Sequence, residues 1–285
     1  MRRLPVQRLL RLLIAAGALA GVLAALAPQA RAEHTEDQRI TDDTADTLRD
    51  GDVRLGLFKA EVGVLDDLTL TSHTLPWFIL AANLGAKYRL YQQDPWSISA
   101  RLSVFHLDLQ RLIGDEGTPE ASISIVPVEF FSSYRLSSWP MSLHAGITFS
   151  GVKVNGSLDE QDVKGAAAQS NVMLSGSLEY RWTARSALVF FTRAIVLQEL
   201  SGGTTSTFNP DDFTTVELVG GVGVDGNGAG LGNAFQVGGA WVYSSDSFNL
   251  RLGGGFGDVI APVVNIGFPT RGRTFIPEID LYWIF

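Results

Sequence analysis

Three of the four histidines, His73, His106 and His144, could activate a nucleophile or a water molecule. His106 has Asp108 two residues further on, and His73 follows a pair of aspartates at 66–67. A lone histidine on the polar face of a strand is far more often a hydrogen-bonding residue than a catalyst, and no two histidines lie at metal-ligand spacing. The sequence therefore favours a protein that is not an enzyme and holds no metal, with hydrolysis as a weaker alternative.

Cofactor motifs are equally weak in this chain. Gly226, Gly228 and Gly232 match a phosphate-binding glycine pattern only loosely, and no strand-helix-strand context surrounds them. The chain has no cysteine, which excludes disulfides, thiolate metal sites and a cysteine-linked lipid anchor. We therefore predict no cofactor, and the chemistry of the chain must come from how its elements arrange charged side chains.

The first of these elements is a targeting segment, residues 1–32. Four arginines and no acid occur within residues 1–11, an apolar stretch covers 12–26, and Ala-Arg-Ala at 30–32 supplies a small-x-small cleavage site. We predict a signal peptide that is cleaved after Ala32. A membrane anchor is the alternative, but the apolar run is short for one.

Export would leave a strongly acidic chain. Removal of five arginines leaves 17 basic residues against 30 acidic ones and a net charge of about −13, which argues against nucleic acid as a partner. Residues 33–52 are polar and acidic without an apolar period. We expect them to form a mobile periplasmic lead-in, partly disordered, rather than a cation site.

Period-two alternation of apolar and polar residues runs through most of the chain after Val53. Residues 141–154 and 171–183 alternate almost ideally, which places one apolar face outward and one polar face inward. Residues 96–109 and 121–136 alternate too, but each changes phase once, near Val104-Phe105 and near Ile125-Val126. We expect a β-bulge at each change.

Connections between these strands are of two kinds. Short turns at 92–95, 137–140, 183–186 and 244–247 alternate with longer polar loops such as 110–120, 155–168 and 258–273. Five tryptophans lie near the short turns or the C-terminus and predict one aromatic girdle at a membrane interface. They are Trp96, Trp139, Trp182, Trp241 and Trp283.

The C-terminal strand carries a family resemblance. Phe275, Ile279, Leu281, Trp283 and Phe285 share one face, which Pro277 interrupts, while Glu278, Asp280 and Tyr282 share the other. A terminal Phe on an alternating, aromatic-rich strand closely resembles the C-terminal insertion signature of Gram-negative outer-membrane barrels. The resemblance implies that Phe285 is read by the barrel-insertion machinery and that the barrel lies among outer-membrane lipids.

A second resemblance lies near the start of the barrel. LFKAEVGVLDDLTLTSH resembles the "YGLTDRLEL"-like hairpin of uncharacterised or transport-related outer-membrane barrels, with Asp66 at the turn aspartate and Leu65 where that family usually has Thr. We therefore predict an antiparallel transmembrane β-barrel over residues 53–285, porin-like, with about 12 strands and with 10 or 14 as alternatives. Its short turns would face the periplasm.

Two segments, 213–233 and 75–78, fit this plan less well. Residues 187–200 and 235–243 have the pattern of strands, but the segment 213–233 between them is too long for a loop and too rich in glycine for confident pairing. We expect an extracellular excursion there, with a hairpin that extends beyond the membrane. Leu75-Pro76-Trp77-Phe78 predicts a strand rim in the outer aromatic belt rather than a binding site.

Function has to come from the lumen, where the strand phases place many ionisable side chains. The candidates are Lys87, Arg89, Arg101, Asp108, Glu129, Arg135, Glu179, Arg181, Arg193, Arg251, Glu278 and Asp280, with His106 and His144. We favour a narrow channel for small hydrophilic solutes, in which Arg89, Arg135, Arg181 and Arg251 form a basic collar that prefers anions. A closed barrel with arginines paired to lumen acids, or binding by the loops, remains the alternative.

Overall fold

The computed structural model describes residues 40–108, 120–136, 139–158, 163–208, 216–220, 235–245, 247–257 and 274–285. The predicted signal peptide (1–32), the glycines 226–232 and the loop 258–273 lie outside these residues. The strands are β1 Val53–Gly56, β2 Lys59–Leu65, β3 Leu68–His73, β4 Ala82–Gln93, β5 Trp96–Asp108, β6 Glu120–Leu136, β7 Met141–Leu158, β8 Val163–Thr183, β9 Ser186–Phe208, β10 Val216–Gly220, β11 Phe235–Ser245, β12 Phe248–Gly257 and β13 Thr274–Ile284.

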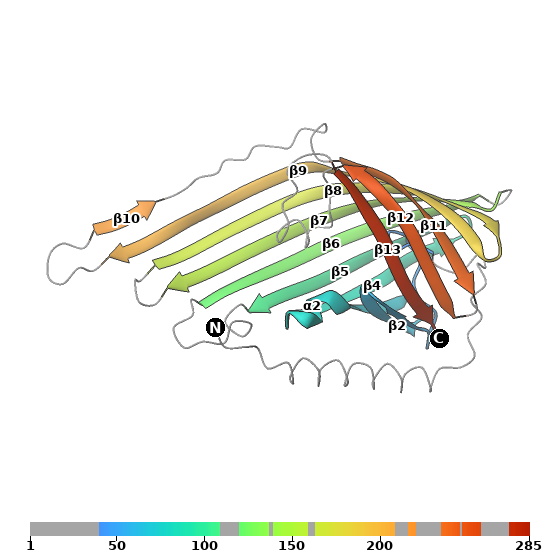
Figure 1. The fold of residues 1–285 in the computed structure, drawn as a ribbon, viewed down its shortest axis with the longest axis horizontal. Coiled ribbons are helices and arrows are strands. Elements are labelled where there is room, and N and C mark those ends of the chain that lie inside the picture. The colour runs from blue at the N-terminus through green and yellow to red at the C-terminus, as the bar shows by residue number, and fades with distance from the viewer. Residues whose placement is uncertain are drawn as a thin grey trace.

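These strands form one antiparallel sheet that closes on itself (Figure 1). From β9 the order runs through β11, β12, β13 and β1 to β8, and β8 pairs back with β9, so that twelve of the described strands make the barrel wall. Closure satisfies most of the backbone hydrogen bonds that an open sheet would leave exposed to lipid at its edges, although residues 274–280 of β13 pair on one side only among the described strands. The prediction of about 12 strands is confirmed.

The remaining strand, β10, extends the wall instead of closing it. Val216 to Gly220 pairs with Phe208 to Thr204, the far part of β9, beyond the part of β9 that pairs with β11. Most of the excursion expected over 213–233 lies outside the described residues; its described part, β10, pairs with the end of β9.

The short turns lie side by side at one end of the barrel. Backbone hydrogen bonds link neighbouring turns: Arg135 N donates to the Pro95 carbonyl (2.9 Å), and Arg181 N donates to the Pro140 carbonyl (2.8 Å). Val53 and Phe285 exchange backbone hydrogen bonds at the same end. The start of the barrel, its end and the short turns therefore share one rim.

Side chains alternate between the two faces as the sequence predicts. On β7 and β8 the apolar Leu143, Phe149 and Leu174 are exposed on the outside, whereas Ser142 and Glu179 are buried inside. On β13 Ile279 and Trp283 are exposed outward and Tyr282 is buried. An apolar outer face around a polar interior is the arrangement of a transmembrane β-barrel.

The two predicted phase changes are wrong. Leu102 pairs with Val128 and Phe105 with Ile125, so β5 and β6 keep one register through the region. The inward face itself becomes apolar: Phe105, Ile125 and Val152 are buried against one another inside the barrel. The same alternation turns His106 outward, where it is exposed, and with it Asp108, so neither residue belongs to the lumen.

Residues 75–78, expected as a strand rim, belong to the short helix α2 (Thr74–Phe78) instead. Within the described part of the chain, no helix is long and apolar enough to cross a membrane.

Candidate channel lumen

The lumen is occupied by residues 40–48, which we call the plug segment. Ile40, Thr44, Ala45 and Leu48 are buried although they belong to no strand. Ile40 packs with Ala187, Val189 and Val242 of the wall. The expectation of a mobile lead-in over 33–52 is therefore wrong for residues 40–48.

Backbone and hydroxyl groups attach the plug segment to one side of the wall. Ala45 N donates a hydrogen bond to Ser133 Oγ (2.8 Å), and Leu48 N donates to Thr69 Oγ1 (2.8 Å). Lys87 Nζ on β4 donates to the Thr44 carbonyl. These bonds satisfy backbone groups of an irregular chain that would otherwise be buried without partners.

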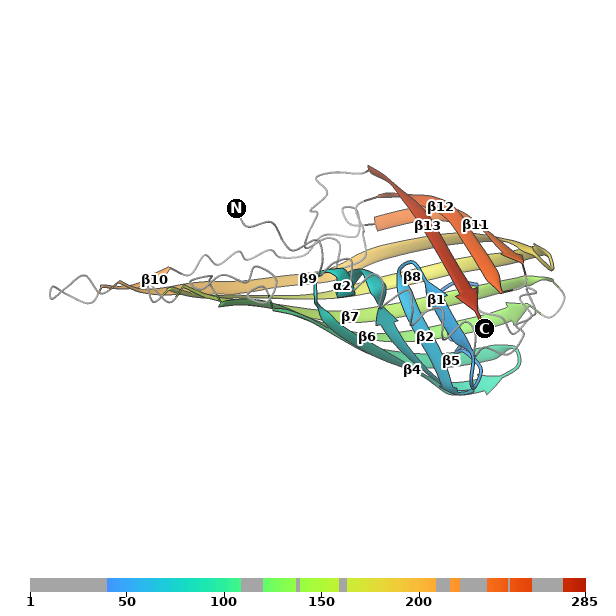
Figure 2. The same ribbon diagram turned by 60° about the horizontal axis from the view of Figure 1, so that its bottom comes forward.

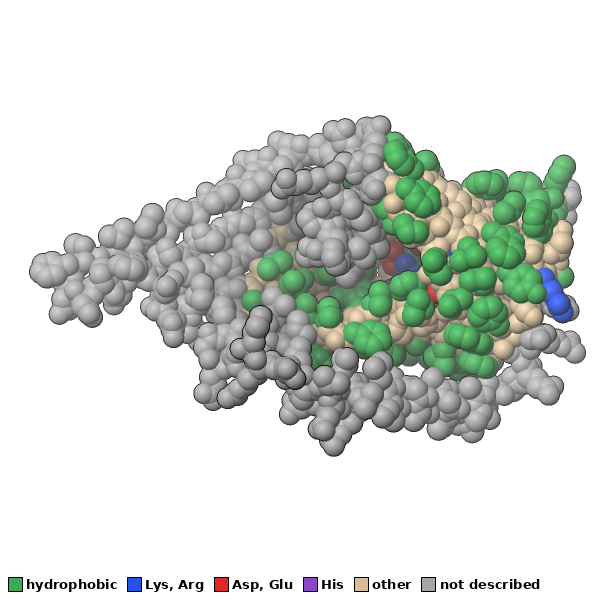
Figure 3. All heavy atoms as spheres, in the orientation of Figure 1, with side chains coloured by type: hydrophobic (Ala, Val, Ile, Leu, Met, Phe, Trp, Pro, Cys, Tyr) green, Lys and Arg blue, Asp and Glu red, His purple; other side chains and the backbone are tan. Residues whose placement is uncertain are grey.

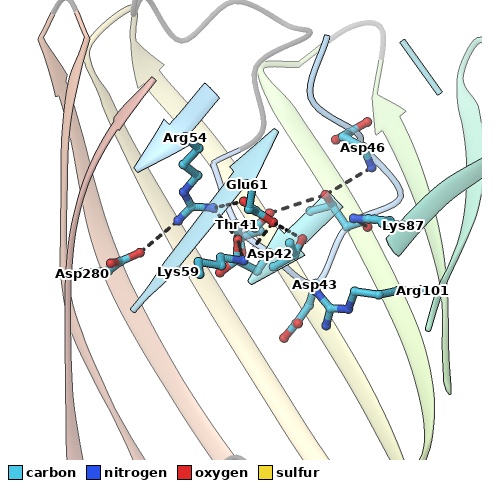
Figure 4. Close-up of polar contacts among 12 residues, drawn as sticks. Thr41, Asp42, Asp43, Asp46, Arg54, Lys59, Glu61, Lys87, Arg101 and Asp280 are labelled. Atoms are coloured by element: carbon cyan, nitrogen blue, oxygen red, sulfur yellow. Dashed lines mark hydrogen bonds and ion pairs between the residues drawn. The ribbon is translucent and has the colours of Figure 1, made fainter. Parts of the chain in front are cut away.

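Three aspartates of the plug segment form ion pairs with cations from different parts of the wall. The Asp42 carboxylate lies 2.6 Å from Arg54 and 2.5 Å from Lys59 (Figure 4). Elsewhere in the lumen, the carboxylate of Asp43 lies 2.9 Å from Arg193 on β9, and that of Asp46 lies 2.8 Å from Arg135 on β6. The plug segment is thus held across the lumen and not only along one strand.

Electrostatics around Asp43 favour its ionised form. Burial raises the pKa of the Asp43 carboxyl, but the guanidinium groups of Arg193 and Arg101 outweigh burial and hold the pKa below its ordinary value of 3.8. A carboxylate inside a barrel is stable only when it is paired in this way.

The four arginines of the predicted collar lie at the expected end of the lumen, and each contacts an acid. Their partners are Asp67 for Arg89 (2.7 Å), Asp46 for Arg135 (2.8 Å), Glu179 for Arg181 (3.5 Å) and Glu278 for Arg251 (3.1 Å). Each arginine of the collar is therefore ion-paired, and one of the acidic partners, Asp46, belongs to the plug segment.

Several other predicted lumen residues also meet partners inside the barrel. Arg101 on β5 and Glu129 on β6 face each other as cross-strand neighbours and form two hydrogen bonds, one of them 2.7 Å long. Glu278 lies 3.6 Å from Arg193, and Asp280 lies 2.9 Å from Arg54. Cross-strand neighbours of opposite charge are what a partly dry lumen requires.

Sequence reasoning missed the cations and acids at the start of the barrel. Arg54, Lys59 and Glu61 are buried on β1 and β2, and Arg54 bonds both Glu61 (3.1 Å) and Asp280 (2.9 Å). Alternation through 53–65 could have placed them inward. Alternation could not have placed the aspartates of the plug segment, because this segment is not a strand and has no period that relates its residues to their partners.

The structure also assembles a row of catalytic residue types that sequence reasoning treated singly. Ser133 Oγ lies 2.7 Å from His144 Nδ1, and His144 Nε2 lies 3.6 Å from Glu179 Oε1. All three residues are buried, and Ser133 Oγ also accepts the hydrogen bond from Ala45 N. In this arrangement the serine anchors the plug segment.

The five tryptophans of the predicted girdle lie close to the short-turn rim. Trp96, Trp139, Trp182 and Trp283 are exposed on the barrel surface, and Trp241 is half-buried. Trp96 packs against Tyr134, with ring centroids 4.7 Å apart and the rings tilted by 59°. The placement of this band at a membrane interface, and the role of Phe285 in insertion, stay predictions.

Comparisons with known proteins show only distant likeness, so we assign the barrel architecture from the strand pairing. No protein-family model matches the sequence, and no curated protein matches it. Among solved structures, the TodX deltaS2S3 mutant monoaromatic hydrocarbon channel matches at 9% identity and TM-score 0.26, covering 82% of this chain and 89% of that one. A major outer membrane protein from Thermus thermophilus matches at 10% identity and TM-score 0.24, covering 82% of this chain and 98% of that one. A closed antiparallel barrel with an apolar outer face and a charged lumen has the architecture of porin-like outer-membrane barrels.

Proposed function

We propose that this chain is an outer-membrane channel that its own residues 40–48 close, and that it conducts when this plug segment leaves the lumen. The observation that carries the proposal is the set of ion pairs from Asp42, Asp43 and Asp46 to Arg54, Lys59, Arg193 and Arg135. These contacts are polar and reversible, unlike a dry apolar core.

The wall is built to remain a barrel without the plug segment. Its twelve strands close through backbone pairing alone, and internal pairs such as Arg101 with Glu129 do not involve residues 40–48. Departure of the plug segment would cost ion pairs and hydrogen bonds but would not open the sheet.

Selectivity then belongs to the open state. When Asp42, Asp43 and Asp46 leave, their cationic partners stay in the wall without those carboxylates. A lumen with excess positive charge favours anions. The expected anion preference is thus tied to the absence of the plug segment.

Neutralising the three aspartates tests this function. The variant Asp42→Asn/Asp43→Asn/Asp46→Asn should show conductance steps in a planar bilayer at least about tenfold more often than the unaltered protein, because charge-assisted pairs contribute more than neutral hydrogen bonds. A reversal potential in a salt gradient should show preference for anions.

The matched control is Asp50→Asn, at an exposed residue just beyond the plug segment. It should leave conductance unchanged. If the triple variant folds, is heat-modifiable and remains as silent as the control, the plug segment does not gate the lumen, and the chain is a closed structural barrel.

A further inference from the structure

Among the described strands, the barrel wall is incomplete beside β13. Pairing between β1 and β13 ends at Gly56 with Tyr282, followed by one hydrogen bond from Leu57 N to the Leu281 carbonyl (2.9 Å). From Asp280 to Thr274, β13 pairs with β12 on one side, and no described strand pairs with its other edge. Figure 2 shows how short β1 and β2 are beside β13.

The backbone of β13 is adapted to this open edge. Phe285 and Leu281 direct their backbone groups to β1, so the two-residue period directs Ile279 and Pro277 to the same edge. Proline has no N–H to leave unpaired, and within sheets it is confined to edges and bulges. Pro277, which interrupts the apolar face in the sequence, therefore removes one donor from an edge that faces lipid.

A cavity of about 390 Å³ opens at this place. Its lining joins the two faces of the wall, because Phe58, Pro277 and Ile279 belong to the apolar outside whereas Asp43 and Arg193 lie in the lumen. Figure 3 shows this face, with acidic and basic side-chain atoms at the floor of a hollow between hydrophobic side chains.

The opposite border of the opening is apolar as well. Thr74 at the start of α2 donates to the Phe58 carbonyl (3.0 Å), which ties the helix to the β1–β2 turn. Leu75, Trp77 and Phe78 of this helix are exposed. This exposed apolar border suits contact with acyl chains better than contact with water.

Inside the opening, apolar and charged surfaces meet. His73 lines the cavity and packs against Phe105, with ring centroids 5.1 Å apart. Phe105 continues into the apolar inner cluster with Ile125 and Val152. A molecule in the cavity would thus find cations and carboxylates near the plug segment and apolar side chains behind His73.

We infer that this opening is a lateral portal, through which a small amphipathic molecule, apolar with one polar head group, passes between the lumen and the lipid phase. The inference rests on the proposed channel for its transport role. It adds to that proposal a route that leads sideways through the wall and not along the barrel axis, and its solute is amphipathic, unlike the small hydrophilic solutes expected from the sequence.

Single cysteines test the portal cleanly, because the natural chain has none. His73→Cys places a thiol in the cavity, and Ser175→Cys places one in the lumen on β8, a strand whose wall is paired on both sides. Each variant in lipid vesicles is exposed to a maleimide on a long alkyl chain, dissolved in the bilayer. Leu174→Cys, exposed on the outside, reports that the reagent is present.

The portal predicts that the membrane-dissolved maleimide labels His73→Cys at least about tenfold faster than Ser175→Cys. Phe58→Ala, which widens the mouth, should raise the labelling rate at His73→Cys further, whereas Phe130→Ala on the intact wall should not. Equal rates at the two lumen cysteines, or no labelling at His73→Cys, would overturn the portal. Labelling requires no conductance, so failure of the portal and failure of the plug are separate results.

Discussion

Deletion of residues 40–48 should convert a silent barrel into a conducting one. The segment fills the lumen with buried side chains and spans it with ion pairs to Arg54, Arg135 and Arg193. Its removal leaves a wall closed by backbone pairing around a charged and hydrated interior. In planar bilayers we expect stable unitary steps from the deletion variant and rare or no steps from the full chain.

Heat-modifiable migration on gels is the control for this deletion, since it reports an intact barrel. If the deletion variant is folded but shows the same conductance as the full chain, the lumen is blocked by the wall itself. The closed structural barrel would then replace the gated channel.

Acidification should open the barrel through Asp43. Because the neighbouring Arg193 and Arg101 hold the pKa of its carboxyl below 3.8, the docked plug segment favours ionised Asp43 more strongly than the released segment does. Asp43 therefore stabilises docking fully above pH 3.8, and this contribution is lost as the pH falls through the lower pKa of the docked state. Asp42, the other acid near Asp43, opposes its ionisation.

The expected result is a severalfold rise in open events below about pH 4, measured in the same bilayer at constant salt. Asp43→Asn should be more open at neutral pH and should show a smaller acid step. Asp50→Asn should keep the step of the unaltered protein. An acid step of the same size in Asp43→Asn would assign the opening to another group.

The wall was predictable because its pattern is local. Strands β7, β8 and β13 alternate with period two, and this period fixes which side chains reach the lumen without knowledge of their partners. Arg181 and Glu278 could be placed inward on this basis alone. The strand count followed from the short turns, which recur between the strands.

The contents of the lumen were not predictable in the same way. Asp43 pairs with Arg193, which is 150 residues away, and no periodic signal connects an irregular segment to a distant strand. The apolar inner face at Phe105 and Ile125 was mistaken for a change of phase, because a lumen was assumed to be polar throughout. Composition showed only that the plug segment is acidic, and the strand phases placed arginines on the inward face of the wall.

A reversible disulfide between the plug segment and the wall tests most directly the central claim that the plug segment closes the lumen. Ala45 N lies 2.8 Å from Ser133 Oγ, so cysteines at these two positions are placed to form a disulfide, which spans about 4.4–6.8 Å between Cα atoms. The measurement is the conductance of Ala45→Cys/Ser133→Cys combined with the three Asp→Asn substitutions, before and after reduction. A gating plug predicts a silent oxidised barrel that conducts when reduced and falls silent when reoxidised. Equal conductance in both redox states, with the disulfide verified by mass spectrometry, would contradict the account.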